Sequence, residues 1–481
     1  MSDGADSTIA ELIASVKKGS VIAAAGCGKT EQIALAAKVA SGRRLILTHT
    51  HAGVDALRQR LKDHGVPSNN FRLDTIGGWC LRYAASFPKR SGLTLREPKD
   101  DGDWRAIYLA AAKLIGGGAV DRVLAASYSG VFVDEYQDCS ADQHAVMISL
   151  AARLPMCVFG DHLQAIFDFK GQAPVDWKAD VFPAFPEATR LTKPWRWHKA
   201  ENPCLGNWLE DVRTALDERR ELDLRTGPDC VTWDWLPDYD GPRQSKITAT
   251  CKSAMNLDGR LIVIADPTNL EGRAQIAKRL AKQGFSNIEP LDCKSLFSSA
   301  KAIENASDAT RLQMALDFLV KCMIGVDRSP FKTAVASRKA GGKKGTAQFG
   351  ELVDLGVALA GPGGERYLLD FFREFERRSN TYMFRREMFS AMRSGLKAHL
   401  AEESESLVDA LRHTQNRVRH AGRVIARRSV GSTLLVKGLE FEHAIVVHSP
   451  NMNRKDWYVA LTRATQSVTI LAPQERLRLP D

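Results

Sequence analysis

The feature that most constrains the fold of this chain is a glycine-rich turn near its N-terminus, Gly26-Cys-Gly-Lys-Thr30. An apolar run at 21–25 precedes the turn and an alanine-rich stretch at 31–40 follows it, a pattern that predicts a strand, a tight loop and a helix. In such a loop the backbone N–H groups and the helix N-terminus face phosphate oxygens, and a lysine reaches the β- and γ-phosphates. Ala23 replaces the first glycine of the strict pattern, and its small side chain still leaves the loop room to curl. We therefore predict that a nucleotide phosphate is bound by Ala25, Gly26, Cys27, Gly28, Lys29 and Thr30.

Two acidic residues, Asp134 and Glu135, end a second apolar run at 131–133. At the end of a buried strand, one carboxylate can hold Mg²⁺ while its neighbour polarises an attacking water. We assign Asp134 to the metal, together with the Thr30 hydroxyl, and Glu135 to the water. Taken alone, the pair is also compatible with a solvated strand end. Together with the phosphate loop, it favours hydrolysis of a nucleoside triphosphate.

Short apolar runs alternate with helical stretches along most of the chain, which is typical of an α/β fold with parallel sheets. In the N-terminal part these runs are 21–25, 45–47, 131–133 and 156–159. A second block has runs at 261–265, 444–447 and 467–471. Within this second block, between the runs 261–265 and 444–447, residues 326–429 carry a Gly/Lys-rich patch, long charged helices and a basic run at 412–428. We interpret this stretch as a domain inserted into the second block.

The composition restricts the class of protein and its surroundings. At 481 residues the chain is too long for one hydrophobic core, and its 44% hydrophobic and 26% charged residues are typical of a soluble globular protein. The nine cysteines form no CxxC pair, which argues against a zinc site, an iron–sulfur cluster or a disulfide framework. No apolar run is long enough to span a bilayer and no charged-then-apolar leader begins the chain, so we expect a cytoplasmic protein without a membrane partner. The net charge of +10 is equally compatible with nucleic-acid binding and with a merely basic surface.

Seven segments, in order, resemble the motifs of UvrD/Rep-like superfamily 1 DNA helicases. Asp134-Glu-Tyr-Gln-Asp138 is similar to the family's DEFQD-type segment, and Lys437-Gly-Leu-Glu-Phe441 and Tyr458-Val-Ala-Leu-Thr-Arg463-Ala are nearly verbatim versions of its last two motifs. The others are Leu47-Thr-His-Thr-His51 with 56–60, Asp74-Thr-Ile-Gly-Gly-Trp79 with Leu81-Arg82, Gly160-Asp161 with Gln164, Phe167, Phe169 and Gly171, and the segment 191–196. The resemblance covers roughly 20–325 and 430–475.

The resemblance implies an α/β fold of two RecA-like P-loop lobes with parallel sheets, plus a mostly helical insertion in the second lobe. The expected divisions are lobe 1 with the phosphate loop and Mg²⁺ site at 1–185, including a short insertion at about 84–128, then the first part of lobe 2 at 186–325, a basic accessory insertion at 326–429, and the second part of lobe 2 at 430–481. In this family the accessory domains bind duplex and regulate unwinding. Both insertions here are shorter than the usual ones.

The resemblance also implies ATP and Mg²⁺ as cofactors and assigns roles to single positions. The implied catalytic residues are Lys29, Asp134, Glu135, Gln164, Arg196 and Arg463. Gln164 would sense the γ-phosphate and couple it to the DNA groove, and Arg196 and Arg463 from the second lobe would act as arginine fingers. Trp195 would stack on adenine and Glu440 would contact the nucleotide sugar. Buried structural arginines and a core tryptophan are the alternatives.

For the nucleic-acid track, the resemblance implies contacts from Thr48, His49, Thr75, Phe167 and Phe169. Base stacking on an aromatic ring is sequence-tolerant and contributes about 1–3 kcal/mol per base, which suits a motor that steps past any base. The two phenylalanines alternate with Asp168, so a structural strand explains them almost as well. The basic run at 412–428 is compatible with a grip on duplex or phosphate and equally with a solvated helical face.

These features predict an ATP-dependent DNA helicase or translocase that moves 3′→5′ on single-stranded DNA or a tailed duplex. The short accessory domains leave a second hypothesis open, a DNA-gated ATPase subunit of a repair or anti-phage complex. Such a subunit would license a partner nuclease and would unwind little itself. We find no clustered Asp, Glu and Lys set outside the motor motifs, so a nuclease would have to be a partner.

Overall fold

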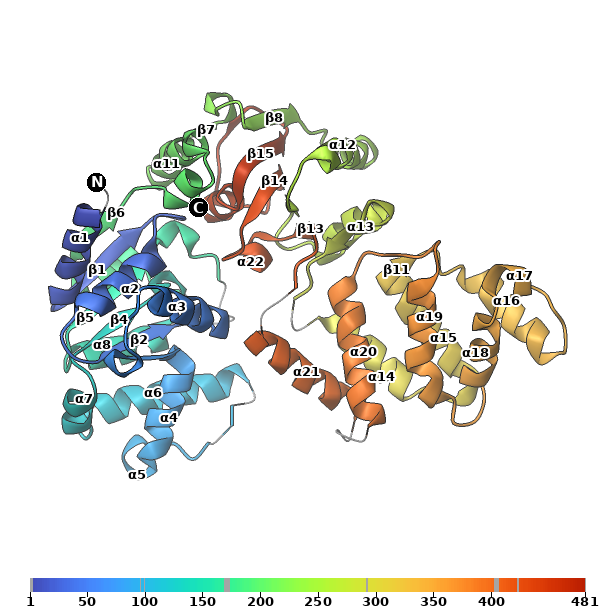
Figure 1. Cartoon of the computed structure of the whole chain (residues 1–481), viewed down its shortest axis with the longest axis horizontal. Coiled ribbons are helices and arrows are strands. Elements are labelled where there is room, and N and C mark those ends of the chain that lie inside the picture. Colours follow the sequence, from blue (N-terminus) through green and yellow to red (C-terminus); the bar gives the residue numbers. More distant parts are fainter. Residues whose placement is uncertain are drawn as a thin grey trace.

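Two six-stranded parallel sheets organise the chain (Figure 1). The computed structural model describes residues 3–95, 97–98, 100–167, 174–290, 293–401, 406–421 and 424–480. The strand order of the first sheet is β3-β2-β4-β5-β1-β6. Its strands are β1 (Lys18–Ala23), β2 (Arg44–Thr48), β3 (Phe71–Thr75), β4 (Gly130–Val133), β5 (Met156–Gly160) and β6 (Glu187–Leu191). Its helices are α1 (Asp3–Ser15), α2 (Lys29–Val39), α3 (His51–Asp63), α4 (Ile76–Ser86), α5 (Pro88–Ser91), α6 (Asp101–Gly116), α7 (Asp121–Ser127), α8 (Ala141–Ala151) and α9 (Phe182–Ala184).

Alternate residues of these strands face opposite sides of the sheet, and both sides are covered by helices. Ile46 of β2 and Phe132 of β4 share a buried cluster with residues of α1, α2 and α3. Their neighbours Leu47 and Val133 belong to the cluster formed with α4, α6 and α8. Because both faces are buried, the strands carry continuous apolar sequence, which is the pattern seen in the sequence.

The second sheet has the order β10-β13-β9-β14-β15-β8 and again only parallel pairs. Its strands are β8 (Val231–Trp235), β9 (Leu261–Ile264), β10 (Phe285–Asn287), β13 (Arg428–Gly431), β14 (Phe441–Val447) and β15 (Ala464–Ala472). The helices of this lobe are α10 (Trp195–Lys199), α11 (Pro203–Asp217), α12 (Asp240–Ser253), α13 (Leu270–Arg279), α22 (Thr433–Val436) and α23 (Arg454–Leu461). Two short antiparallel pairs join β7 (Leu222–Asp223) to β16 (Arg476–Leu477) and β11 (Met323–Ile324) to β12 (Tyr382–Met383).

A helical unit leaves lobe 2 after β10 and returns at β13, two strands that are neighbours in the sheet. Its helices are α14 (Lys294–Glu304), α15 (Asp308–Cys322), α16 (Arg328–Lys339), α17 (Thr346–Phe349), α18 (Leu352–Leu359), α19 (Leu368–Arg377), α20 (Arg386–Leu400) and α21 (Leu407–Ala421). They enclose a core of their own, which is rich in phenylalanine. Two RecA-like α/β lobes with a helical insertion in the second lobe are therefore confirmed.

The element boundaries differ from the expected divisions at two places. α14 and α15 precede residue 326, yet Leu296 and Phe318 pack in the core of the helical unit. Their apolar residues recur at helical spacing, a pattern that does not indicate which neighbour the helix packs against. β6 extends lobe 1 beyond residue 185, because it pairs with β1 of the first sheet.

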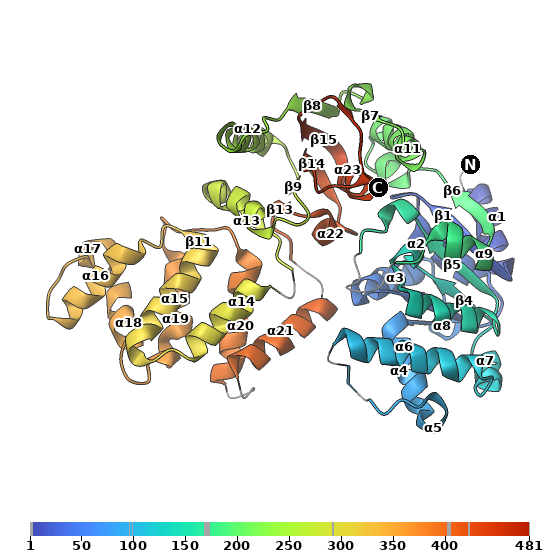
Figure 2. The same ribbon diagram turned by 180° about the vertical axis from the view of Figure 1, so that it is seen from behind.

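The helical unit contacts both lobes. At its base Arg385 donates to both carboxylate oxygens of Glu289 at 2.6 and 2.8 Å, and both side chains are buried. At its other side α21 contacts α3 of lobe 1, so the unit lies against the first lobe as well as the second (Figures 1 and 2). No helix among the described residues is both long and apolar enough to cross a lipid bilayer.

Truncation of one core ring should destabilise the helical unit selectively. Phe331 is fully buried and its ring lies 5.0, 5.8 and 5.3 Å from those of Phe349, Phe371 and Phe375. We expect Phe331→Ala to lower the free energy of unfolding of this unit by about 3–5 kcal/mol. Hydrogen exchange should show lost protection in α14–α21 and retained protection in the lobe 1 strands. The adjacent Lys332→Ala serves as control, and an equal loss of protection in lobe 1 would contradict an independent core.

Candidate active site between the two lobes

The phosphate loop lies between β1 and α2, at the carboxyl edge of the first sheet. Gly26 and Gly28 have φ values of 71° and 82°, which glycine adopts without strain. A Cβ atom on Gly26 would lie 2.8 Å from the Arg196 Cβ and 2.8 Å from the Trp197 ring. The loop therefore takes a shape that only glycine permits, with the N-terminus of α2 behind it.

Lys29 lies close to both predicted carboxylates. Its ammonium is 2.7 Å from Glu135 Oε1 and 3.9 Å from Asp134 Oδ1, and its side chain is 10% exposed. Asp134 follows β4 directly, and its backbone N–H donates to the Leu47 carbonyl of β2 at 2.8 Å. Parallel strands thus deliver the two carboxylates to the edge where α2 begins.

The charged groups of this cluster shift one another's pKa values. Burial acts to lower the pKa of Lys29, but the Glu135 and Asp134 carboxylates outweigh it and raise that pKa. Burial raises the pKa of Asp134 to about 7, although the Lys29 ammonium opposes this shift. Burial also acts to raise the pKa of Glu135, yet Lys29 and Lys437 lower it to about 2. Glu135 is accordingly the permanent anion of the pair.

Glu135 has a strained backbone for a non-glycine residue, with φ at 55°. Gln137 holds its side chain by a hydrogen bond from Nε2 to the carboxylate. The same Gln137 accepts the Asp161 backbone N–H at 3.1 Å through Oε1. The strain and the hydrogen bonds together fix the direction of the carboxylate.

The two residues predicted to hold Mg²⁺ come from different elements of lobe 1. Thr30 is the second residue of α2, and Asp134 is the first residue after β4. Within the described ranges, no three His, Cys, Asp or Glu side chains gather into a metal-binding group. This donor set suits Mg²⁺, which commonly takes one or two protein ligands and completes its shell with phosphate oxygens and water.

Gln164 is buried at the boundary between the lobes, where its side chain and its backbone carbonyl each accept or donate a hydrogen bond. Its Nε2 donates to Asp161 Oδ2 at 3.1 Å, and Asp161 accepts from Arg213 at 3.1 Å. Its backbone carbonyl accepts from the Lys437 ammonium at 2.6 Å. Gln164 thus joins the end of β5 to lobe 2.

Lys437 is a residue whose role the sequence alone did not indicate. Its ammonium donates to both oxygens of Asp138 at 2.6 and 2.7 Å, and both side chains are less than a tenth exposed. The ammonium also lies 4.9 Å from the centre of the Phe167 ring. Lys437 and Asp138 both lie in segments that resemble helicase motifs, but their pairing across the lobes appears only in three dimensions.

The predicted arginine fingers occupy different environments. Arg196 donates to Glu440 Oε1 at 2.8 Å and to the Thr462 carbonyl at 2.9 Å, while its backbone N–H donates to the Gly26 carbonyl at 3.0 Å. Arg463 is fully buried and directs its donors to the Val459 and Leu439 carbonyls and the Thr462 hydroxyl. Burial, and then the charge of Arg196, lower the pKa of Arg463 to about 9.

Trp195 borders the phosphate loop. A Cβ atom on Gly28 would lie 3.2 Å from Trp195 Cδ1. The Lys193 ammonium lies 3.6 Å from the centre of the indole ring and covers one of its faces. Glu440, which is about half exposed, reaches the same area through its pair with Arg196.

Two more side chains of lobe 2, Tyr458 and Glu210, contact the phosphate loop, and the sequence alone did not indicate either contact. The Tyr458 hydroxyl accepts the Ala25 backbone N–H at 3.0 Å, and this tyrosine is almost fully buried. The Cys27 thiol lies 3.7 Å from Glu210 Oε1, and burial raises the pKa of the thiol. A buried thiol with a raised pKa is unreactive, so Cys27 contributes packing and backbone shape.

Three of the predicted track residues, Thr48, His49 and Thr75, lie at the ends of β2 and β3. Thr48 and Thr75 are register partners there, and both are buried. The Thr75 hydroxyl caps α4 by accepting the Gly78 N–H at 3.0 Å. His49 lies 3.6 Å from the Cys139 thiol, and burial lowers its pKa to about 4, so the ring is neutral at pH 7. Phe169 and Gly171 lie outside the described residues.

One segment of the chain matches a known protein family. Residues 101–176, which include Asp134 to Asp138 and Gln164, match the family described as UvrD/REP helicase N-terminal domain. No curated protein sequence matches the chain.

Several solved helicase structures are similar at low sequence identity. An arterivirus nonstructural protein 10 helicase in complex with DNA is 11% identical, with a TM-score of 0.36 over 97% of this chain and 63% of that chain. The helicase of PRRSV is 12% identical, with a TM-score of 0.31 over 96% and 54%. A Bacteroides Pif1 helicase bound to ADP-AlF3 and single-stranded DNA is 14% identical, with a TM-score of 0.26 over 52% and 57%. The chain thus spans less than two thirds of the length of these proteins, and the assignment of the fold rests on its own two sheets.

Loss of the lysine between the lobes should destabilise the protein strongly. Lys437→Ala leaves the Asp138 carboxylate buried without its cation, and we expect a loss of about 3–5 kcal/mol. Urea denaturation of the whole chain measures this as a lower midpoint. Combining Lys437→Ala with Asp138→Asn should recover a large part of the loss, because no buried charge remains unpaired. A single variant that unfolds at the same urea concentration as the unsubstituted chain would contradict this role.

Proposed function

We propose that this chain hydrolyses ATP between its two lobes and uses the energy to move along single-stranded DNA as a helicase or translocase. The observation that carries the proposal is the juxtaposition of Lys29, Asp134 and Glu135 on lobe 1 with Arg196 of lobe 2 at the phosphate loop. Chemistry of this kind needs positioning and charge stabilisation more than covalent participation. The match of residues 101–176 to the UvrD/REP helicase N-terminal domain supports the same activity.

In this proposal the phosphate loop and Lys29 hold the phosphates of ATP. The loop offers the backbone N–H groups of Gly26, Gly28, Lys29 and Thr30, whereas the Cys27 N–H donates to the Ala24 carbonyl at 3.1 Å. Lys29 exchanges its contact with Glu135 for one with the β- and γ-phosphates. Thr30 and Asp134 would hold Mg²⁺, which supplies charge neutralisation at the phosphates when bound. Glu135, whose pKa the nearby Lys437 ammonium also lowers, orients and polarises the attacking water.

Two arginines and an indole complete the proposed nucleotide site from the lobe 2 side. Arg196 acts as the arginine finger, because its backbone is already bonded to the phosphate loop and its guanidinium is partly exposed. Arg463 contributes positive electrostatic potential to the site from its buried position. Its guanidinium reaches the phosphates only if it leaves the Val459 and Leu439 carbonyls. Trp195 stacks on the base, and Glu440 contacts the sugar.

The contacts of Lys437 support a role for this residue in coupling ATP hydrolysis to the residues proposed to bind DNA. One ammonium joins Asp138 beside the catalytic carboxylates, the backbone of the γ-phosphate sensor Gln164, and the ring of Phe167. A change at the γ-phosphate therefore reaches the proposed base-stacking ring through adjacent contacts. Phe167 and Phe169, with Thr48, His49 and Thr75, form the proposed track, and resemblance of the segment 437–441 suggests 3′→5′ movement.

A second candidate function is a DNA-gated ATPase that licenses a partner nuclease in a repair or anti-phage complex. The helical unit is the observation that favours it, since it is the one large insertion in the described chain and carries a core of its own. Both candidates share the nucleotide site and differ in whether hydrolysis separates strands.

ATP hydrolysis should depend on single-stranded DNA and on Lys29. We expect DNA to stimulate hydrolysis and Lys29→Ala to lower kcat by about 10²–10³, because one phosphate donor is lost. Arg196→Ala should cost about 10³–10⁵ if it is the finger. Lys38→Ala, on the exposed side of α2, is the control and should keep full activity. Hydrolysis that ignores DNA, or that persists without Lys29, would refute the proposal.

Strand displacement distinguishes the two candidate functions. We expect the isolated chain to displace the labelled strand of a duplex with a 3′ single-stranded tail and to leave a duplex with a 5′ tail intact. Displacement from the 5′ tail alone would refute the polarity. DNA-stimulated hydrolysis without displacement on either substrate would favour the gated ATPase over the helicase.

A further inference from the structure

Helix α11 of lobe 2 has an apolar side in the core of its own lobe and a charged side against lobe 1. Leu205, Leu209 and Leu216 pack in the buried cluster that holds the lobe 2 strands. Three charged residues of the same helix, at spacings of three and four, lie on one side of it and each contacts a residue of lobe 1. The three pairs are Glu210 with the Cys27 thiol at 3.7 Å, Arg213 with Asp161 at 3.1 Å, and Asp217 with His162 at 2.7 Å.

The pair of Arg213 with Asp161 is the most deeply buried of the three. Asp161 is fully buried and Arg213 is 6% exposed, whereas each of the other pairs has a partly exposed member. Burial acts to lower the pKa of Arg213, but the Asp161 carboxylate outweighs it and raises that pKa. In the part of the chain that the structure describes, no second cation pairs with Asp161. A buried carboxylate without a cation is costly, so the position of the Asp161 carboxylate depends on Arg213.

Asp161 in turn holds the side chain of Gln164. Its Oδ1 accepts from Arg213, while its Oδ2 accepts from Gln164 Nε2 at 3.1 Å. The two oxygens of a carboxylate are fixed relative to each other, so the direction that Arg213 gives to one oxygen also sets the other. The amide of Gln164 has two N–H donors, and Asp161 takes one and leaves the second for a ligand.

Asp161 has another connection, which stays within lobe 1 and does not depend on Arg213. Its backbone N–H donates to Gln137 Oε1 at 3.1 Å, and Gln137 Nε2 donates to the Glu135 carboxylate. Because this connection starts from the backbone of Asp161, it persists when the lobes move apart. Arg213 is therefore the contact by which lobe 2 controls the Asp161 carboxylate, and through it Gln164 but not Glu135.

We propose that Arg213 is a positioning residue for ATP hydrolysis, which acts through Asp161 to direct the second N–H of Gln164 at the γ-phosphate. The inference rests on the proposed function, which supplies ATP and the role of Gln164. Since Arg213 belongs to lobe 2 and Asp161 to lobe 1, Gln164 is held in this direction only while the lobes are in contact. ADP has no γ-phosphate, so this device acts on the triphosphate and not on the diphosphate.

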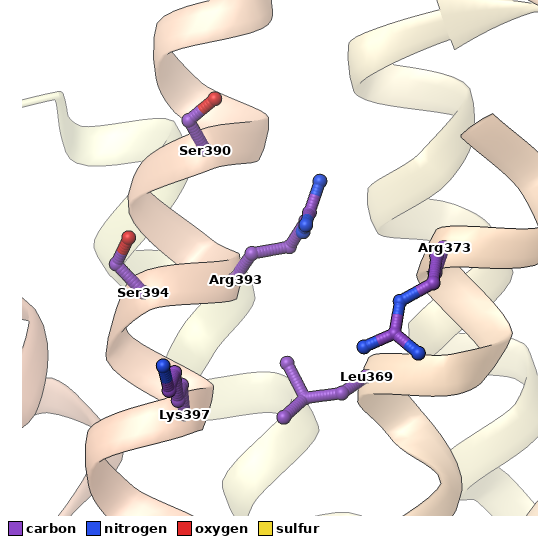
Figure 3. Close-up of a pocket in the computed structure, with 6 residues that line it drawn as sticks. All are labelled: Leu369, Arg373, Ser390, Arg393, Ser394 and Lys397. Carbon is purple, nitrogen blue, oxygen red and sulfur yellow. The ribbon is translucent and has the colours of Figure 1, made fainter.

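The test uses variants of the full chain. Arg213→Gln removes the cation, and Arg213→Lys keeps a cation without the planar fork, which serves if the neutral variant does not fold. The matched control is Arg393→Gln, which breaks an ion pair with Glu376 in a groove between α19 and α20 of the helical unit (Figure 3). The measurements are kcat at saturating single-stranded DNA and the affinities for ADP and for an ATP analogue with an N–H bridge between its β- and γ-phosphates.

We expect Arg213→Gln to lower kcat by about 10–100-fold, because a reacting group displaced by about 1 Å costs that much. It should weaken binding of the ATP analogue by about tenfold, the loss expected for one hydrogen bond to a charged group. Affinity for ADP should stay within about twofold. Arg213→Lys should show a smaller loss of the same kind, and Arg393→Gln should leave all three quantities unchanged. Equal weakening of ADP and of the analogue overturns the proposal, because it indicates a purely structural role.

A double variant distinguishes positioning from direct contact with the nucleotide. If Arg213 acts through Gln164, adding Arg213→Gln to Gln164→Ala should lower kcat by less than about a further twofold. Losses that multiply overturn the proposal, because they assign Arg213 a role independent of Gln164.

The inference and the proposed function fail separately. If hydrolysis depends on Lys29 and Arg213→Gln leaves kcat unchanged, the motor stands and the inference falls. If the unsubstituted chain hydrolyses no ATP, the proposed function falls, and the two affinities still decide the inference. A loss confined to the ATP analogue then keeps the positioning role of Arg213, and unchanged affinity for the analogue removes it.

Discussion

The arrangement of the two lobes depends on one buried ammonium. Lys437 of lobe 2 contacts both oxygens of Asp138 and the carbonyl of Gln164, all within 2.7 Å. Removing these groups from water costs several kcal/mol per charge, which only close and multiple contacts offset. The lobes therefore lie where the lysine has three acceptor atoms, and the same relative position brings Tyr458 to the phosphate loop.

This placement of the lobes also explains why the proposed catalytic groups come from segments that are far apart in the sequence. The phosphate loop contacts Arg196 through backbone, Tyr458 through a hydroxyl and Glu210 through Cys27. A small rotation of lobe 2 changes all of these contacts together, because packed interfaces shift between discrete arrangements. In the proposed mechanism, closure of the lobes around a nucleotide would therefore change contacts along the whole boundary between the lobes and not at one side chain.

Much of the fold could be predicted from local sequence, and the contacts between lobes could not. The run 131–133 followed by Asp134 and Glu135 specifies a buried strand and its acidic end by itself, and the structure has β4 and the Lys29 cluster there. Trp195 and Arg196 were recognisable only by resemblance. Lys437 and Asp138 are far apart in sequence, and neither carries a periodic signal that names its partner. The start of the helical unit at α14 was missed because a helix with one apolar face packs equally well on a sheet or on other helices.

The helical unit enters and leaves lobe 2 through β10 and β13, which are side by side at the edge of the sheet. A module attached in this way can be exchanged, lengthened or lost during evolution without reordering any strand of its host, since the two attachment points already meet. A different domain inserted at this edge would have to reproduce the buried Glu289–Arg385 ion pair or do without it. This architecture therefore allows related proteins to keep the two lobes and to differ in the domain inserted at this edge.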